Sequence, residues 1–113
     1  MITYWHNPRC SKSRAGLQIL EEHSADHKVR LYLDDNPTGE EIRQVQQRSG
    51  LPITDLLRPC EPVFAELGLA LSDPEDVLIA AMAAHPILIQ RPIAITGTAA
   101  VIGRPPEQVK RLL

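Results

Sequence analysis

The sequence predicts an α/β protein with a four-stranded mixed sheet, in which the elements follow the order β-α-β, a helical block, then β-β-α. A strand–helix–strand pattern opens the chain, helix-start signals dominate its middle, and two short β-prone segments flank a Thr-Gly-Thr turn near its end. The length of 113 residues, with 43% hydrophobic and 23% charged residues, suits one domain. We therefore expect a single domain, residues 1–113, with a helical insertion at about 38–85.

The first third of the chain predicts a βαβ unit. Residues 2–5 are β-prone and end in a His-Asn-Pro turn at 6–8. Because a residue before proline avoids helical geometry, a helix begins only after this turn. Apolar residues then recur at helical spacing over 11–24, and residues 28–33 alternate polar and apolar as a second strand does. A strand, a helix and a strand within this length favour a parallel pair.

The first helix of the insertion opens with a capping box. Thr38 suits the N-cap, and Glu41 follows three residues later. The apolar stripe of this helix is thin, consisting of Ile42 and Val45. Gly50 ends the helix, because glycine readily adopts the left-handed conformation of a helix terminus.

Further helices fill the rest of the insertion. Short helical pieces are expected at 53–58 and 62–67. The Ser-Asp-Pro-Glu-Asp segment at 72–76 is a strong helix start, with proline in the first turn and acidic residues favoured by the helix dipole. Residues 77–84 are mostly apolar, so we expect them to be buried, and His-Pro at 85–86 stops the helix.

The C-terminal third predicts a hairpin and a final helix. Residues 92–95 and 100–102 read as two strands around the turn at 96–98. The Pro-Pro-Glu segment at 105–107 then opens a short helix. These elements complete the β-β-α half of the sheet.

Composition excludes several classes of protein. The formal net charge of −2 gives no bulk attraction to nucleic acid or to a membrane. No apolar run approaches the ~20 residues of a membrane helix, and no secretory signal is visible. Two cysteines do not form a disulfide framework. We expect a reduced, cytoplasmic protein that binds neither nucleic acid nor a membrane.

Cys10 is the candidate nucleophile. It lies between a strand-ending turn and the first turn of a helix, where unpaired backbone N–H groups stabilise a thiolate or an oxyanion. Cysteines in such positions have pKa values of roughly 3.5–7.5 in place of about 8.5. A buried core thiol is the alternative, but such a thiol usually sits in an apolar pattern, whereas polar residues flank Cys10: Arg9, Ser11, Lys12 and Ser13.

Other site chemistries fit less well. Arg14 follows Cys10 too soon for the Cys–Arg loop of phosphatases, and the segment 10–13 offers no second sulfur for a thioredoxin-type dithiol. The histidines and cysteines show no paired metal-ligand spacing, so no metal is expected. A monothiol site must take its second thiol from another molecule or from Cys60.

Four segments together resemble the glutaredoxin-dependent arsenate reductase (ArsC-like) family. They are Tyr-Trp-His-Asn-Pro-Arg-Cys-Ser-Lys-Ser-Arg at 4–14, Leu-Leu-Arg at 56–58, His-Pro-Ile-Leu-Ile-Gln-Arg-Pro-Ile at 85–93 and Gly-Arg-Pro-Pro-Glu at 103–107. The last is most similar to a short branch of that family. The resemblance spans nearly the whole chain, and the joint occurrence is specific where a single segment is not.

The resemblance implies a thioredoxin-like fold, with the helical insertion between the βαβ and ββα halves. It also implies that Cys10 attacks arsenate and that Arg58, Arg91 and Arg104 hold the oxyanion. Pro92 would be the cis-proline that thioredoxin folds place opposite the cysteine. Arg91 and Arg104 each precede proline at the ends of the last two strands, so we expect them to lie near each other. Taken alone, Arg58 fits a solvated side chain or a surface ion pair better than a binding role.

Three residues around Cys10 have supporting roles in this interpretation. His6 either orients or acidifies Cys10, or is simply exposed in the turn. Asn7 and Ser13 donate to the thiolate or to the oxyanion. Glutathione is the expected co-substrate and glutaredoxin the expected protein partner, with no bound cofactor.

Two other functions remain open, as does the role of Cys60. A general monothiol oxidoreductase acting on glutathione mixed disulfides needs Cys10 but not all three arginines. An RNA-polymerase-binding regulator of the same fold usually carries Cys-x-x-Cys and lacks the terminal Arg-Pro, so Ser13 and Arg104 argue against it. Cys60 follows Arg58 closely and is either a resolving thiol or a non-catalytic one.

Overall fold

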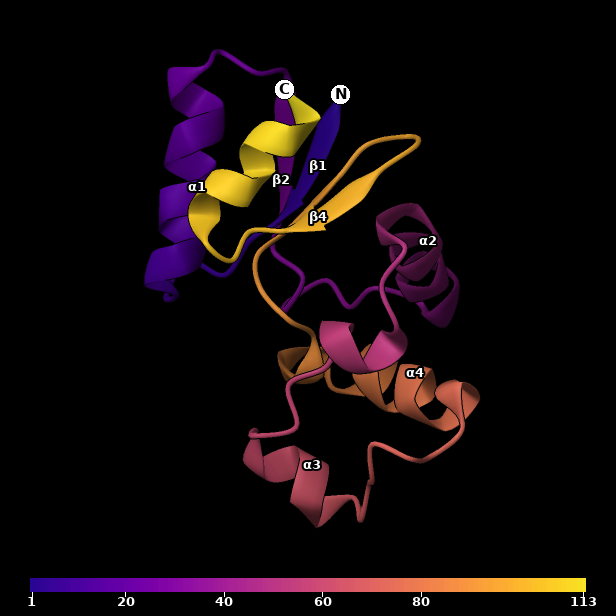
Figure 1. Ribbon diagram of the computed structural model, residues 1–113. Coiled ribbons are helices and arrows are strands. Elements are labelled where there is room, and N and C mark those ends of the chain that lie inside the picture. The colour runs from indigo at the N-terminus through magenta and orange to yellow at the C-terminus, as the bar shows by residue number, and fades with distance from the viewer. The chain divides into compact units, whose positions relative to one another are not determined.

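Four strands form one mixed sheet in the order β2-β1-β3-β4 (Figure 1). Strand β1 (Ile2–Trp5) pairs in parallel with β2 (His27–Arg30) and antiparallel with β3 (Ile93–Ile95), which pairs antiparallel with β4 (Ala100–Ile102). The computed structural model describes residues 1–113. These residues fall into two compact units: the first comprises residues 1–35 and 91–113, and the second comprises residues 36–90. The predicted α/β class and the four-stranded mixed sheet are confirmed.

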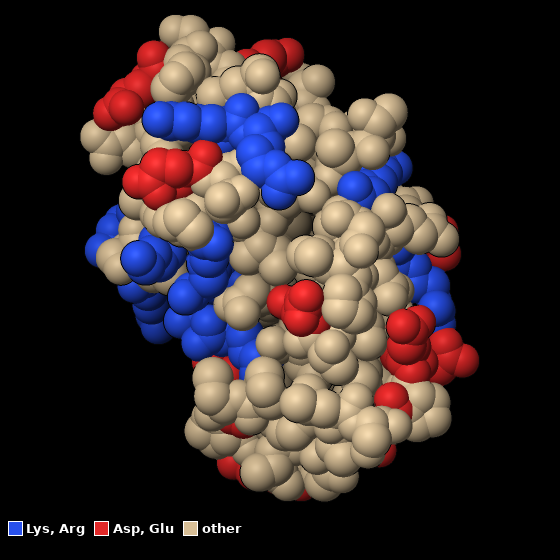
Figure 2. Space-filling view, in the orientation of Figure 1, with Lys and Arg blue, Asp and Glu red and all other residues tan.

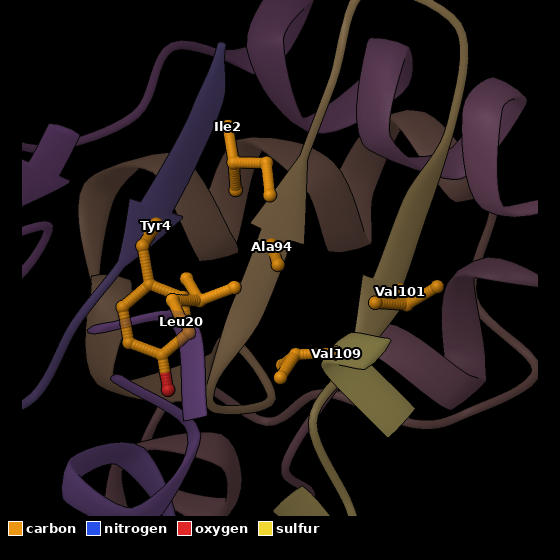
Figure 3. Packing of buried hydrophobic residues seen from close by; sticks show 6 residues of the cluster. All are labelled: Ile2, Tyr4, Leu20, Ala94, Val101 and Val109. Carbon is orange, nitrogen blue, oxygen red and sulfur yellow. The ribbon is translucent and has the colours of Figure 1, made fainter. Parts of the chain in front are cut away.

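Two helices lie side by side on one face of the sheet in the first unit (Figure 1). They are α1 (Ser11–Glu22) and the 3-10 helix η3 (Pro106–Leu112). Alternate strand residues point toward these helices, because successive side chains of a strand face opposite ways. Figure 3 shows the resulting core, whose members are Ile2, Tyr4, Leu20, Ala94, Val101 and Val109.

Strand β2 ends earlier than its sequence pattern predicts. Alternation suggested residues 28–33, but the strand covers His27–Arg30 and the chain then turns, with Asp34 N–H donating to the Leu31 carbonyl. The Tyr32 ring stacks on Trp5 with centroids 6.4 Å apart and is buried. As an edge strand, β2 leaves Val29 exposed.

The second unit is helical. Its elements in chain order are α2 (Gly39–Ser49), the 3-10 helix η1 (Ile53–Leu56), α3 (Pro62–Glu66), α4 (Glu75–Ala84) and the 3-10 helix η2 (Pro86–Leu88). The predicted capping box is confirmed, since Thr38 Oγ1 accepts from Glu41 N–H at 3.1 Å and Glu41 Oε1 accepts from Thr38 N–H at 3.0 Å. Gly50 ends α2 with φ at 70°. None of the helices in the structure has the length and apolar character that crossing a membrane requires.

Two expectations in this unit are corrected. The helical piece expected at 53–58 ends at Leu56, and Leu57 is extended because it forms a bridge with Ile89. Burial of 77–84 is confined to one face of α4, where Leu78, Ile79 and Met82 are buried, while Val77 is 44% exposed. An amphipathic helix packs only one stripe, however apolar its sequence is.

Candidate active site

Cys10 is the N-cap residue of α1. Its backbone is extended (φ −97°, ψ 122°), and its side chain makes no capping bond to the helix. The turn before it is closed by Asn7, whose side-chain Oδ1 accepts from Arg9 N–H and whose carbonyl accepts from Cys10 N–H, both at 3.0 Å. Asparagine before proline favours such a turn. The local sequence therefore places the thiol at the positive end of the helix.

The surroundings of Cys10 favour its thiolate. Burial raises the pKa of the thiol, but hydrogen bonds outweigh this effect: the Ser13 backbone N–H, the Arg91 side chain and the Lys12 backbone N–H all bond the sulfur, and the charge of Arg91 adds to them. The pKa of Cys10 therefore lies below its ordinary value. A nucleophilic cysteine needs this, because the thiolate is the reactive form.

Ser13 connects the parts of the loop that holds Cys10. This serine is fully buried, and its Oγ lies 2.7 Å from His6 Nδ1 and accepts from Asn7 N–H at 2.9 Å. Its carbonyl accepts from the Tyr4 hydroxyl at 2.6 Å. Ser13 thus reaches Cys10 through its backbone N–H, while its hydroxyl organises the turn. Asn7 likewise uses its side chain within the turn.

His6 is buried, at 7% exposed, which excludes the simple exposed turn histidine. Burial lowers the pKa of His6, and the nearby charge of Arg14 lowers it further, against a smaller opposing effect of Glu21. The imidazole is therefore neutral at neutral pH and cannot acidify Cys10 through charge. Its bond to Ser13 gives it an orienting position instead.

Arg91 and Arg104 lie together, as predicted. The Arg104 Nε donates to the Arg91 carbonyl at 2.7 Å, and the Arg91 side chain bonds the Cys10 sulfur. The Arg91–Pro92 bond is cis, as the family resemblance implied, and Arg104–Pro105 is a second cis bond that the sequence did not predict. The Gly103 N–H donates to the Pro92 carbonyl at 2.9 Å, which ties the two arginine segments together.

Arg58 and Cys60 belong to the second unit. The Arg58 guanidinium donates from Nε to Glu61 Oε1 at 3.1 Å and from Nη1 to Gln90 Oε1 at 3.3 Å. Its Nη2 forms an ion pair with Glu61 Oε1 at 3.0 Å. Cys60 is exposed and forms no disulfide. The first unit alone therefore brings together Cys10, His6, Asn7, Ser13, Arg91, Pro92 and Arg104.

Exposed cations surround the start of α1. Arg9, Lys12 and Arg14 are exposed, and the first turn of α1 has no acidic residue. Figure 2 shows Lys and Arg side chains gathered over this end of α1. The charges of these cations have the same sign as the N-terminal end of a helix dipole, so the two effects add. The local potential at Cys10 is therefore positive although the whole chain is slightly acidic, and it suits an anionic substrate.

Sequence reasoning missed three residues that hold the predicted ones: Tyr4, Glu61 and Gln90. Tyr4 reads as a core position of a strand, and only the fold shows its hydroxyl on Ser13. Glu61 stands three residues after Arg58 and carries the opposite charge, but no helix there sets their geometry, so the sequence does not reveal their ion pair. Nowhere do three or more His, Cys, Asp or Glu side chains gather in a group that could hold a metal.

Comparisons with known proteins agree with this fold. The sequence model of the ArsC family matches residues 5–112. An arsenate reductase of Neisseria meningitidis is 39% identical, covering 99% of this chain and 97% of the relative. A Streptomyces viridochromogenes protein named "Uncharacterized protein in glnII region" is 46% identical over 96% of each chain. A solved structure named arsenate reductase from Vibrio cholerae, 41% identical, has a TM-score of 0.94 and covers 99% of this chain and 97% of its own. The thioredoxin-like fold expected above is thus confirmed.

Proposed function

Because the chain belongs to the ArsC family, we propose that it is a thiol-dependent reductase that converts arsenate to arsenite, with the Cys10 thiolate as nucleophile. The position of Cys10 at the N-cap of α1 carries this proposal, because backbone N–H groups and the Arg91 side chain stabilise its thiolate there. We choose arsenate as the substrate because relatives of this chain are named arsenate reductase.

Three arginines hold the oxyanion in this proposal: Arg58, Arg91 and Arg104. Arsenate is an anion at neutral pH, and guanidinium groups offer planar, permanently charged donors that suit its oxygens. Bringing a thiolate to an anion is repulsive, so cations must screen both. The bond between Arg104 and Arg91 supports their joint role. Arg58 is included because the Leu-Leu-Arg segment at 56–58 is part of the resemblance to the family.

The reaction transfers two electrons from external thiols to arsenic. The Cys10 thiolate attacks As(V), an S–As bond forms, and an oxygen leaves as water or hydroxide. Glutathione forms a second S–As bond and displaces another oxygen as water. The glutaredoxin thiolate then attacks the glutathione sulfur, which forms a mixed disulfide and leaves the electron pair of the broken S–As bond on arsenic, now As(III). Water releases arsenite and returns the Cys10 thiol. We propose a cytoplasmic location, because this chemistry needs reduced thiols.

A coupled assay tests the proposal. Arsenate-dependent oxidation of NADPH is measured with glutathione, glutaredoxin and glutathione reductase for wild type, Cys10→Ser and Arg91→Ala. The proposal requires turnover by wild type, loss of turnover in Cys10→Ser and a strong reduction in Arg91→Ala. Absence of wild-type turnover with working coupling enzymes contradicts it. Turnover of a glutathione mixed disulfide would then indicate a monothiol oxidoreductase, and capture of RNA polymerase without turnover would indicate a regulator.

A further inference from the structure

The Arg58 side chain is held on two sides within the second unit. Glu61 Oε1 accepts from Nε and forms an ion pair with Nη2, and Gln90 Oε1 accepts from Nη1. An arginine has five side-chain N–H donors, and two of them make these hydrogen bonds. The two ion-paired side chains are largely covered, at 14% exposed for Arg58 and 16% for Glu61.

The backbone around the pair is fixed as well. Arg58 N–H donates to the Leu88 carbonyl and Gln90 N–H to the Leu56 carbonyl, both at 2.7 Å, which places the Arg58 and Gln90 segments side by side. Glu61 N–H donates to the Arg58 carbonyl at 3.2 Å and closes a turn between the two ion-paired residues. The backbone turn therefore orients the Glu61 carboxylate toward the Arg58 guanidinium.

A second ion pair in the same unit shows the contrast. Arg43 and Asp76 also pair, but their side chains are 42% and 83% exposed. Exposed pairs of this kind contribute little, because solvent screens them and each side chain loses rotamer freedom. The pair of Arg58 and Glu61 is largely covered, so it restricts the conformations of its arginine far more than the exposed pair restricts Arg43.

We infer that Glu61 is a positioning residue for Arg58 in the reductase site. Its carboxylate oxygen holds the Nε–Nη2 edge, and the guanidinium presents its remaining N–H groups to the oxyanion. This inference rests on the proposed function, in which Arg58 binds arsenate. Restraining the arginine before substrate arrives removes an ordering cost from binding. The negative charge of Glu61 acts in the opposite direction, since it competes with the substrate for the same cation, so the two effects predict opposite changes in KM.

Two substitutions of Glu61 distinguish its effect on the position of Arg58 from the effect of its negative charge. Glu61→Ala removes the acceptor, and we expect KM for arsenate to rise about tenfold with kcat changed by less than about threefold, the size expected for a charge-assisted hydrogen bond. Glu61→Gln keeps an acceptor without the charge, and KM should stay within about threefold of wild type. A fall in KM in both variants, an unchanged KM in Glu61→Ala, or equal rises in both overturns the inference.

A double-substitution cycle tests whether Glu61 acts through Arg58. In an Arg58→Ala background, Glu61→Ala should change KM by less than about twofold, because residues that act together are not additive. A full tenfold effect in that background overturns the inference. Asp76→Ala is the matched control, since it removes the carboxylate partner of an arginine in the same unit and should leave KM unchanged.

A binding measurement separates failure of this inference from failure of the proposed function. In a Cys60→Ser background only Cys10 reacts with iodoacetamide, and inorganic phosphate should protect it in a saturable manner. Protection that needs about tenfold more phosphate in Glu61→Ala than in Glu61→Gln supports the role of Glu61 even if arsenate turnover is absent. Equal protection in the two variants overturns that role even if wild type reduces arsenate.

Discussion

The Nε atom of Arg104 donates to the backbone carbonyl oxygen of Arg91 at 2.7 Å. This bond connects Arg91, two residues before β3, with Arg104, two residues after β4, and antiparallel pairing of the two strands brings these points together. It uses one donor of Arg104 to fix the direction of the rest of the guanidinium. The side chain of Arg91 in turn reaches Cys10, so the strand ends and the nucleophile form one connected group.

Arg104→Lys should lower kcat/KM for arsenate by about ten- to hundredfold, nearly as much as Arg104→Ala, since charge-assisted hydrogen bonds contribute about 1.5–3 kcal/mol. Lysine keeps the positive charge but lacks the planar fork that bonds the Arg91 carbonyl and an oxyanion at once. The coupled assay measures the effect. Arg111→Ala, at an exposed position of η3, is the control and should leave kcat/KM unchanged. Full activity of Arg104→Lys would contradict the directional role.

Arg91→Ala should raise the pKa of Cys10. Removing the side chain takes away both a hydrogen bond to the sulfur and a positive charge near it. The rate of alkylation by iodoacetamide against pH, followed in a Cys60→Ser background, gives the pKa as its midpoint. The midpoint should lie below the ordinary thiol value in wild type and move upward in Arg91→Ala. An unchanged midpoint would show that the N–H groups of α1 alone stabilise the thiolate.

Ser13→Ala should destabilise the protein by about 1–3 kcal/mol, the cost of leaving a buried polar group unsatisfied. The substitution removes the acceptor of Asn7 N–H and the partner of His6 Nδ1. Urea denaturation measures the change. Ser11→Ala is the matched control, because Ser11 lies in the same helical turn but is exposed. Similar stability of both variants would count against the buried network.

The stability of the protein should fall on acidification partly because of His6. Burial lowers the folded-state pKa of His6, so the unfolded chain binds more protons once the pH falls below the ordinary histidine pKa. The stabilisation is therefore present above that pKa and is lost as the pH falls through the lower, folded-state value. Urea denaturation at several values between pH 7 and pH 5 should show a smaller loss for His6→Asn than for wild type. Parallel losses would assign the effect to other groups.

Gly103→Ala should destabilise the protein by about 1–3 kcal/mol, the usual cost of overpacking. A Cβ at this position would lie 2.7 Å from Pro92 Cγ and 3.2 Å from Val109 Cγ1. Gly97→Ala is the control, because nothing lies within 4 Å of its added Cβ. Thermal unfolding distinguishes the two variants. A stable Gly103→Ala would mean that the Pro92 ring moves at little cost.

Much of this architecture follows from local sequence signals, and the exceptions have physical reasons. Cys10 could be identified because a turn and a helix start surround it, and the capping box of Thr38 is a local device. The end of β2 could not be predicted, because alternation continues past Arg30, whereas the chain turns there with the Asp34 and Asp35 N–H groups donating to the Leu31 carbonyl. The tie between Arg104 and Arg91 could be expected as proximity, but its atoms depend on strand pairing.

The partners of Arg58 show the same limit. Its spacing from Glu61 is visible in the sequence, but Gln90 lies 32 positions away and meets Arg58 only because Leu57 bridges Ile89. Contacts of such long range depend on the fold and leave no local pattern. The roles predicted for individual residues through family resemblance remain predictions until the variants above are measured.

The sheet order has a consequence for how this chain tolerates change. Residues 36–90 connect β2 to β3, yet these strands are not neighbours, because β1 lies between them. The register of β3 is therefore set by its pairing with β1 and β4, and not by the length of the connecting segment. Evolution can lengthen, shorten or recompose that segment outside Arg58 and Glu61 without shifting the register of a strand, so much of the helical unit can diversify while the sheet that carries Cys10 stays constant.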